Sequence, residues 1–223
     1  MFKKNGGFVY LMYGPPASGK TTLASFLSRE LKADYVSLGE IVRREISRGT
    51  DLGLKFKKYL DEVMEYPPEL IETAVKNELA SYHNERPVFI FDGLPKYPRE
   101  VPFFVKLLKE ENLKLKDIIV IDLPLDVAMK RTDRRKICSD CLKQQNTGES
   151  GEVCGLCGGQ LVSREDDADF FFKRRYNDYS VSVNEVLGKI GSLAEKIIHI
   201  NGDQPEESVK KDIGEKVKLN MPE

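Results

Sequence analysis

Short apolar segments alternate along the chain with longer segments of helical periodicity. Five short segments are mostly β-branched or aromatic and are bounded by polar residues, so they are expected to be strands. They are FVYLMY (8–13), DYVSL (34–38), RPVFIFD (86–92), KDIIVIDL (116–123) and KIIHIN (196–201). Apolar positions three and four residues apart predict helices near 20–32, 40–48, 68–82, 99–111 and 165–190. This alternation is typical of an α/β fold with a doubly wound, five-stranded parallel sheet.

Residues 137–163 depart from that alternation and are rich in Gly, Cys and polar residues. They contain all four cysteines of the chain, as two C-x2-C pairs, Cys138 with Cys141 and Cys154 with Cys157, separated by 12 residues. Four thiolates at this spacing are typical of a structural Zn²⁺ site, which would hold a segment too small to form its own core. Two disulfides, or iron in a rubredoxin-like site, are the alternatives.

The segment GPPASGKTT (14–22) joins the first predicted strand to the first predicted helix. Its Gly-x4-Gly-Lys-Thr spacing matches the Walker A loop of P-loop NTPases, in which backbone N–H groups surround phosphate oxygens. Lys20 is expected to reach the outer phosphates, and a threonine hydroxyl to face Mg²⁺ directly or through water. A Gly/Pro-rich turn that binds nothing is the alternative. The predicted nucleotide-binding residues of the loop are Gly14, Ala17, Ser18, Gly19, Lys20, Thr21 and Thr22.

Asp92 ends the predicted third strand, within VFIFDGLP (88–95). A carboxylate at the end of a strand beside a Walker A loop typically holds Mg²⁺ and its waters, so Asp92 is the predicted Mg²⁺ residue. An aspartate that only caps a turn is the alternative. The sequence has neither an Asn-Lys-x-Asp guanine motif nor a Leu-Ser-Gly-Gly-Gln signature. A switch GTPase and a transporter ATPase therefore fit poorly.

Arginines lie on both borders of the cysteine segment, with Arg131 and Arg135 before it and Arg164 and Arg175 after it. Two anionic substrates that meet in line need positive charge from several sides, and a guanidinium binds phosphate through two hydrogen bonds at once. A closing flap with arginines at its rim would supply this charge and exclude water. Solvated helix charges are the alternative interpretation.

The overall composition narrows the choice of partners and location. The 223 residues carry a formal net charge of −1 and lack the basic excess of a protein that follows nucleic acid. No apolar run approaches the roughly 18 residues of a membrane helix, and the first 14 residues are too short of apolar length for a signal peptide. We therefore expect small-molecule nucleotide substrates, no nucleic-acid or membrane partner, and a cytoplasmic location. His83 and His199 lie outside every motif and are expected to be structural or solvated.

Taken in order, these segments resemble the nucleoside monophosphate kinase family, specifically adenylate kinases whose lid contains zinc. Nearly the whole chain takes part in the resemblance. The matching segments, besides the Walker A loop and the cysteine pairs, are SLGEIVRREISRGTDLG (37–53), FDGLPKYPREV (91–101), RTDRRKIC (131–138), SREDDADFFFKRRYNDY (163–179) and INGDQP (200–205).

The resemblance implies reversible, Mg²⁺-dependent transfer of the γ-phosphoryl group of ATP to a nucleoside monophosphate, with AMP as acceptor and ADP as product. No side-chain base is needed, because the acceptor phosphate is already an anionic nucleophile. It implies that Arg43 contacts the acceptor phosphate, that Arg135 contacts ATP with help from Arg131, and that Arg164 and Arg175 bridge the transferring group. Further implied residues are Gln204 at the ATP adenine, Asp166 and Asp167 in the closed lid, and Leu38, Tyr66, Gly93, Lys96 and Glu100 at the acceptor.

Four positions depart from the family pattern. Ala17 stands where the family has Gly, and Lys96 stands where it has Arg, so the planar fork is lost unless Arg99 replaces it. In the base pocket, Leu38 replaces a Thr and Glu100 replaces the Gln that reads the base. An ionised Glu can only accept hydrogen bonds and has none to give adenine N1. We therefore expect AMP to remain the main acceptor, with weaker discrimination against GMP or CMP.

The expected organisation is a P-loop core over residues 1–36, 67–130 and 171–223, an inserted helical monophosphate-binding segment over 37–66 and a zinc-binding lid over 131–170. One alternative is a nucleoside monophosphate kinase that prefers GMP, CMP or UMP. Another is a P-loop ATPase whose zinc ribbon binds nucleic acid or a protein partner. A nucleotide-binding protein without catalytic activity is the third, and the presence of Lys20 and Asp92 argues against it.

Overall fold

The core of the protein is a five-stranded parallel sheet, as the sequence predicted. The computed structural model describes residues 6–62, 64–82, 87–132, 135–141, 144–146, 153–163 and 169–218. The strands are β1 (Gly7–Tyr13), β2 (Asp34–Ser37), β3 (Val88–Asp92), β4 (Leu113–Asp122) and β8 (Lys196–Asn201). Their order across the sheet is β2-β3-β1-β4-β8, and every neighbouring pair is parallel. Each predicted strand forms, with ends that differ by up to three residues.

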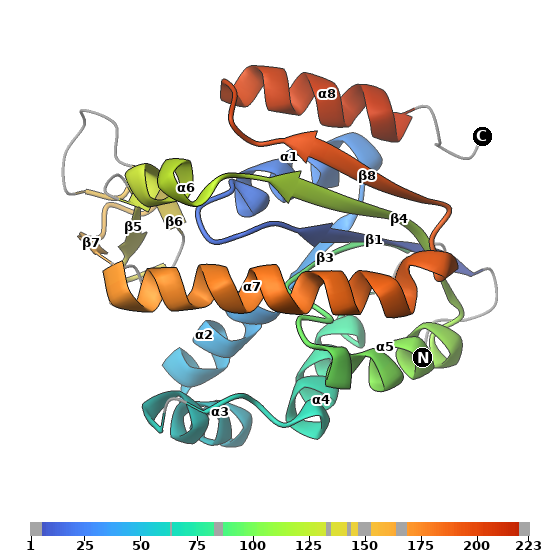
Figure 1. The fold of residues 1–223 in the computed structure, drawn as a ribbon. Coiled ribbons are helices and arrows are strands. Elements are labelled where there is room, and N and C mark those ends of the chain that lie inside the picture. The colour runs from blue at the N-terminus through green and yellow to red at the C-terminus, as the bar shows by residue number, and fades with distance from the viewer. Residues whose placement is uncertain are drawn as a thin grey trace.

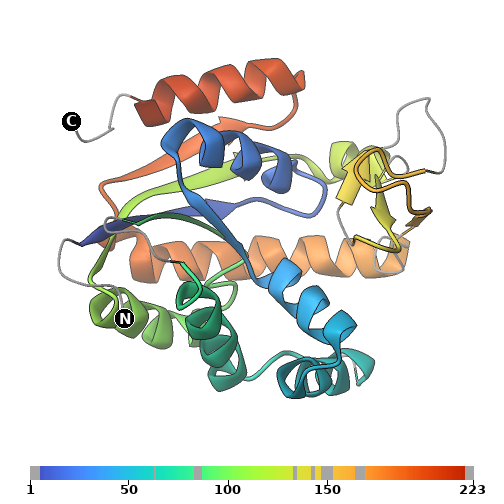
Figure 2. The same cartoon turned by 180° about the vertical axis from the view of Figure 1, so that it is seen from behind.

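The buried side chains of the sheet alternate between two hydrophobic clusters, because successive residues of a strand point to opposite faces. In β1, Val9 and Leu11 join the cluster on one face, whereas Tyr10 and Met12 join the cluster on the other. Helices α1 (Lys20–Leu31) and α8 (Glu206–Lys218) cover the second face. The first face is covered by α4 (Pro68–Leu79), α5 (Val101–Glu110) and α7 (Asp169–Ile190) together with α2 (Leu38–Arg48) (Figures 1 and 2).

Two helices form that the sequence did not predict, α6 (Leu125–Thr132) and α8, whereas α3 (Asp51–Asp61) lies in the 37–66 segment that was expected to be helical. Helix α6 has eight residues and only one buried residue, Ala128, so its apolar periodicity is weak. The five predicted helices all form with small differences in their ends, and α7 begins at Asp169.

Helices α2 and α3 form a tightly joined pair. Side-chain oxygens cap both N-termini: Ser37 accepts from the Glu40 N–H at 3.4 Å and Thr50 accepts from the Gly53 N–H at 2.9 Å. Gly53 is required by the crossing of the helices, because a Cβ there would lie 2.1 Å from the Glu45 carbonyl oxygen. The pair projects from the core as one compact unit (Figure 1).

The cysteine module contains a small antiparallel sheet that the sequence did not predict. Its strands are β5 (Arg135–Cys138), β6 (Gln144–Asn146) and β7 (Leu161–Ser163), in the order β6-β5-β7. The module follows α6 and precedes α7. It lies at the same end of the molecule as the carboxyl ends of the parallel strands and the α2–α3 pair (Figures 1 and 2). In doubly wound folds, this end of the sheet is where ligands bind.

None of the helices in the described part of the chain is long and apolar enough to span a membrane.

Candidate active site

The Walker A segment forms a curled loop between β1 and α1. Two of its residues have left-handed backbone conformations, Ala17 with φ 62° and Gly19 with φ 86°, and these turn the backbone N–H groups toward one side. Helix α1 begins at Lys20 and has no acidic residue in its first turn. The positive end of the helix dipole therefore faces the loop, as a phosphate site requires.

Lys20 spans the mouth of this loop. Its Nζ donates to the carbonyl oxygens of Gly14 at 2.6 Å and Pro15 at 3.0 Å. Gly14 is in close contact with its surroundings, since a Cβ there would lie 2.6 Å from the Ser18 hydroxyl oxygen. Ser18 is buried, and its hydroxyl has no hydrogen-bond partner among the described residues. The loop thus concentrates an ammonium group, backbone amides and a helix terminus within one turn.

Asp92 lies directly beside this loop. It ends β3 and pairs in register with Met12 of β1, two residues before Gly14. The Tyr35 hydroxyl donates to Asp92 Oδ2 at 2.7 Å, and the Thr21 side chain is a hydrogen-bonding neighbour of the same hydroxyl. Burial and the Asp92 charge raise the pKa of Tyr35, so Tyr35 remains a neutral donor at physiological pH.

The carboxylate of Asp92 and the hydroxyl of Thr21 are oxygen donors of the kind that Mg²⁺ prefers, and both lie next to the phosphate loop. Thr22 lies beside Thr21 in the first turn of α1 and is partly buried. The residues present therefore fit a Mg²⁺ ion held between Asp92 and the phosphates. The sequence pointed to Asp92 and Thr21, but no sequence signal marked Tyr35.

A second cationic group lies after β3, where the acceptor phosphate is expected. Lys96 follows the strand, and Arg175 lies in α7. Lys96 has an exposed surface, yet crowding by the surrounding protein and the nearby Arg175 charge together lower its pKa, while Glu100 and Asp178 act in the opposite direction. Because the charge of Arg175 disfavours the charged form of Lys96, a bound anion would relieve this repulsion.

Arg43 and Leu38, which are also expected at the acceptor, lie in α2, and Tyr66 lies between α3 and α4. Burial raises the pKa of Tyr66, and the positive charge of Arg43 opposes that rise, which places the two side chains near each other. The Tyr66 ring packs edge-on against Phe56 with a centroid separation of 4.9 Å. Leu38 is partly buried against the core, at the start of α2. Gly93 adopts φ 77° and turns the chain after Asp92.

Glu100 has partners that the sequence analysis did not foresee. It is 1% exposed, and its Oε2 accepts from the backbone N–H groups of Lys96 at 2.6 Å and Tyr97 at 3.3 Å. Arg99 forms an ion pair with Glu65 and lies over the Tyr97 ring, 4.9 Å from the ring centre. The Glu100 carboxylate, which was expected to read the acceptor base, is thus already hydrogen-bonded to the backbone of its own loop.

The segments expected around the ATP adenine also meet. Arg131 Nη2 donates to the Gly202 carbonyl oxygen at 2.7 Å, across 71 residues of sequence. Gln204 donates through Nε2 to Asp212 Oδ2 at 2.7 Å, at the turn into α8. His199 is exposed and lies 2.9 Å from an Asp122 carboxylate oxygen, in agreement with a solvated residue.

Some predicted residues fall beyond what the structure describes. The backbone of Arg135 lies in β5, but its side chain is outside the description. Arg164, Asp166, Asp167 and His83 lie outside the described residues.

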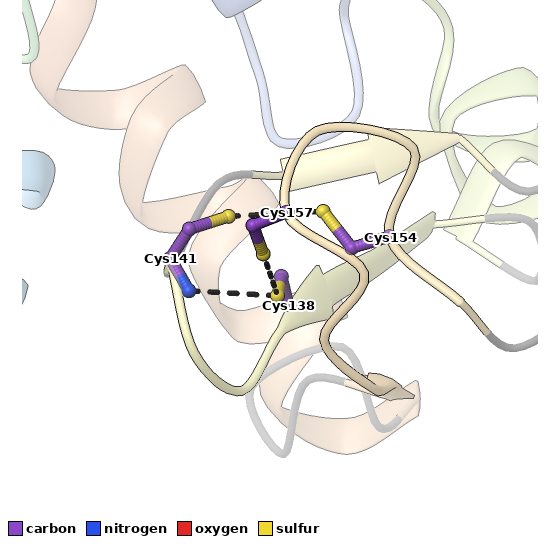
Figure 3. A group of neighbouring side chains, drawn as sticks. All are labelled: Cys138, Cys141, Cys154 and Cys157. Atoms are coloured by element: carbon purple, nitrogen blue, oxygen red, sulfur yellow. Dashed lines mark hydrogen bonds between the residues drawn. The ribbon is translucent and has the colours of Figure 1, made fainter.

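The four cysteines form one compact group, with sulfur atoms all within 4.8 Å of one another (Figure 3). Cys138 Sγ lies 3.5 Å from Cys157 Sγ, and Cys141 Sγ lies 3.7 Å from Cys154 Sγ. A tetrahedron with Zn–S bonds of about 2.3 Å has edges of about 3.8 Å. Backbone N–H groups also point at these sulfurs, from Asp140 to Cys138 and from Leu156 to Cys154, both at 3.4 Å. None of these four cysteines is in a disulfide, and the group can hold a metal ion.

Comparison with known proteins identifies the family. The family model described as adenylate kinase matches residues 12–210. An adenylate kinase of Methanocella arvoryzae is 32% identical over 92% of this chain and 95% of its own length. An adenylate kinase of Desulforamulus reducens is 32% identical over 91% of this chain and 96% of its own length. The adenylate kinase of Thermococcus kodakarensis is 29% identical over 91% of each chain.

With a phosphate loop, a facing cation pair and this extent of similarity, the chain is a phosphotransferase that acts between nucleotides and belongs to the adenylate kinase family.

Proposed function

We propose that this protein catalyses the reversible, Mg²⁺-dependent transfer of the γ-phosphoryl group of ATP to AMP, which yields two ADP. One observation supports the proposal: two cationic groups, each of which we assign to a phosphate, lie at the same end of the sheet. The first is Lys20 with the Walker A loop, and the second is Lys96 beside Arg175. They follow neighbouring strands, β1 and β3, that pair in register up to Asp92.

Two facing phosphate sites suit transfer between nucleotides. The acceptor phosphate carries its own negative charge, so the protein has to position it and neutralise the charge that builds up between the two substrates. Arg43, Arg175 and Lys96 would supply that charge from the acceptor side, and Lys20 from the donor side. Arg131, Arg135 and Arg164 would add charge from the lid. Mg²⁺, when bound by the ATP phosphates with Asp92 and Thr21, supplies further charge neutralisation.

We assign AMP as the acceptor on the strength of the family, because the matched relatives are named adenylate kinases. Binding of the ATP adenine is assigned to the junction where Arg131 contacts Gly202, close to Gln204. Leu38, Tyr66 and Gly93 are assigned to the acceptor pocket. Zn²⁺ is the proposed occupant of the cysteine group. Four protein thiolates leave it no open coordination position, so its role is structural.

A coupled assay of ATP consumption tests the proposal. Purified protein is given Mg²⁺ and ATP, with AMP, GMP, CMP, UMP or a polynucleotide added separately. We expect turnover that depends on a monophosphate and is highest with AMP. Turnover that depends on the polynucleotide, or ATP hydrolysis that no monophosphate affects, would contradict the proposal and favour a P-loop ATPase.

The Lys20→Ala variant tests the proposed phosphate site directly. Because Lys20 is assigned to the phosphates and its Nζ bonds to loop carbonyls, its removal should lower kcat by about a hundredfold or more and leave the fold intact. Lys57→Ala, an exposed lysine that pairs with Asp61 in α3, is the control and should retain wild-type turnover. Near-normal turnover in the Lys20 variant would exclude the assigned phosphate site.

A further inference from the structure

The turn over residues 95–97 connects β3 to the 3₁₀ turn Pro98–Glu100 and is fixed from two sides. On one side, the Tyr13 hydroxyl donates to the Pro95 carbonyl oxygen at 2.9 Å in a buried hydrogen bond between residues 82 positions apart. On the other side, Glu100 Oε2 accepts from the N–H groups of Lys96 and Tyr97. Two consecutive peptide units of this turn, 95–96 and 96–97, are therefore held by buried side chains.

Both side chains are almost wholly inaccessible, with Tyr13 5% and Glu100 1% exposed. Burial raises the pKa of both groups, and the Glu100 charge contributes to the rise at Tyr13, so the two groups lie close together beneath the turn. Tyr179 of α7 adds to the same effect on Tyr13. It lies one helical turn after Arg175 and on the same face of α7.

Tyr13 links the turn over residues 95–97 to the phosphate loop. Tyr13 is the last residue of β1 and directly precedes Gly14 of the phosphate loop. Its hydrogen bond ties the base of that loop to the turn that carries Lys96. Burying a carboxylate or a tyrosine hydroxyl costs more free energy than burying an apolar side chain of similar size, unless the buried group makes its hydrogen bonds. Glu100 and Tyr13 make theirs with the backbone of the turn.

We propose that Tyr13 and Glu100 are positioning residues, which fix the 95–97 turn so that Lys96 is held beside Arg175 for the acceptor phosphate. The inference rests on the proposed function. It replaces the expected role of Glu100 as a reader of the acceptor base. Neither residue is expected to touch a nucleotide; each acts through the backbone of the turn.

Three substitutions test this role, with KM for the acceptor, KM for ATP and kcat measured for each. Tyr13→Phe removes one hydrogen bond and keeps the ring, so KM for AMP should rise about fivefold. Glu100→Ala leaves two buried N–H groups without an acceptor, and KM for AMP should rise tenfold or more. Glu100→Gln keeps an amide oxygen where the carboxylate oxygen lies and should restore KM for AMP to within about twofold of wild type.

Two features separate positioning from base reading and from general destabilisation. Because the turn serves the phosphate, KM for GMP should rise by the same factor as KM for AMP in Glu100→Ala, and the AMP-to-GMP ratio of kcat/KM should be unchanged in Glu100→Gln. KM for ATP should change less than twofold. Tyr82→Phe is the control for Tyr13→Phe, since the Tyr82 hydroxyl donates to Glu78 at 3.2 Å, away from the turn.

The results that would overturn the inference are distinct from those that would overturn the proposed function. A wild-type protein without monophosphate-dependent turnover would overturn both. With an active wild type, an unchanged KM for AMP in Tyr13→Phe overturns the inference, as does a KM for ATP that rises in parallel. An AMP-to-GMP ratio that shifts about tenfold in Glu100→Gln would return Glu100 to base reading. If Glu100→Ala does not fold, the Tyr13→Phe and Glu100→Gln results decide.

Discussion

Ala17 occupies a backbone conformation that its side chain disfavours. Its φ of 62° lies in the left-handed region, where a Cβ approaches the following carbonyl oxygen and costs about 1–2 kcal/mol. Ala17→Gly removes this strain but gives the unfolded chain more freedom. The free energy of unfolding should therefore rise by about 0.5–1 kcal/mol in urea titrations at 25 °C.

Gly19 offers a matched comparison in the same loop, with φ 86° and open space around the position of a Cβ. Gly19→Ala adds backbone strain but also restricts the unfolded chain, so its free energy of unfolding should fall by about 0.5–1 kcal/mol. If Ala17→Gly and Gly19→Ala both raise or both lower the free energy of unfolding, backbone strain in the loop does not control stability at these positions.

Asp117 is the second unusual residue. It lies on β4, is fully buried, and neither carboxylate oxygen has a hydrogen-bond partner among the described residues. Burial raises its pKa, and Glu195 adds to the rise, while Lys116 and Lys196 oppose it. Its charge contributes to the rise in the pKa of Tyr10, to about 12. Glu195 itself forms an ion pair with Lys116 at 2.6 Å.

The raised pKa of Asp117 makes stability depend on pH in a defined direction. The folded protein binds this proton more tightly than the unfolded chain, so the favourable contribution is complete below the unfolded pKa of about 4 and is lost as pH rises through the folded pKa. Asp117→Asn cannot ionise. Its free energy of unfolding should exceed that of wild type by about 1 kcal/mol at pH 8, with a smaller difference at pH 4.5.

Urea unfolding at both pH values checks this expectation. Asp61→Asn is the control, because Asp61 is exposed and pairs only with Lys57 among its described contacts. It should change stability by less than about 0.5 kcal/mol at either pH. A difference between Asp117→Asn and wild type that does not grow with pH would show that Asp117 is not the titrating group.

At the scale of elements, the cysteine module depends on its metal. Its strands have three or four residues, and its small buried cluster consists of Leu161 and three of the cysteines, Cys138 and Cys154 with Cys141 packed against them. Such a segment cannot pay for its own ordering through apolar burial. We expect about one Zn²⁺ per chain on metal analysis. Chelation should abolish activity and add an early melting step in calorimetry, with the far-UV signal of the main sheet retained.

Replacing all four cysteines by serine should have the same effect as chelation. A purified protein that contains no zinc would exclude the proposed metal. A variant with all four serines and wild-type activity and thermal stability would show that the module folds without a metal.

The elements that the sequence predicted are those with strong local patterns. The five core strands were found because β-branched and aromatic runs such as KIIHIN are bounded by polar residues, and β8 has the predicted ends, Lys196 and Asn201. Helix α6 and the module strands were missed, because eight and three or four residues are too few to establish a period. The Walker A loop and the cysteine group were predicted in the same way, from the local spacing of their motif residues.

The contacts that join distant segments could not be predicted. The Tyr13–Pro95 hydrogen bond spans 82 residues, and the Tyr35–Asp92 bond spans 57, so no local pattern marks either one. The backbone partners of Glu100 were missed for a related reason. A resemblance assigns it the role of the residue it replaces, whereas the structure shows its carboxylate bound to the backbone of its own turn.

At the scale of the whole molecule, the proposed donor and acceptor sites consist of different segments that meet at one end of the sheet. The acceptor side uses α2 and the turn after β3, and the donor side uses the Walker A loop and the junction between Arg131 and Gly202. The cysteine module and the α2–α3 pair project from this same end (Figure 2). Each nucleotide should therefore order its own set of segments.

Hydrogen exchange with one nucleotide at a time tests this division, because binding to the folded state slows local opening. AMP alone should slow amide exchange in α2 and in residues 93–101, with little change in the cysteine module. A non-hydrolysable ATP analogue with Mg²⁺ should instead slow exchange in residues 14–22, 131–141 and 200–205. Residues 211–218 of α8, which pack on the opposite face of the sheet from α2, serve as the internal control.

If AMP protects the cysteine module and leaves α2 unchanged, the acceptor and donor sites are assigned to the wrong sides. We expect each nucleotide to protect its own segments. We also expect both nucleotides together to slow exchange at the 95–97 turn more than AMP alone, because the Tyr13–Pro95 hydrogen bond couples the two proposed sites.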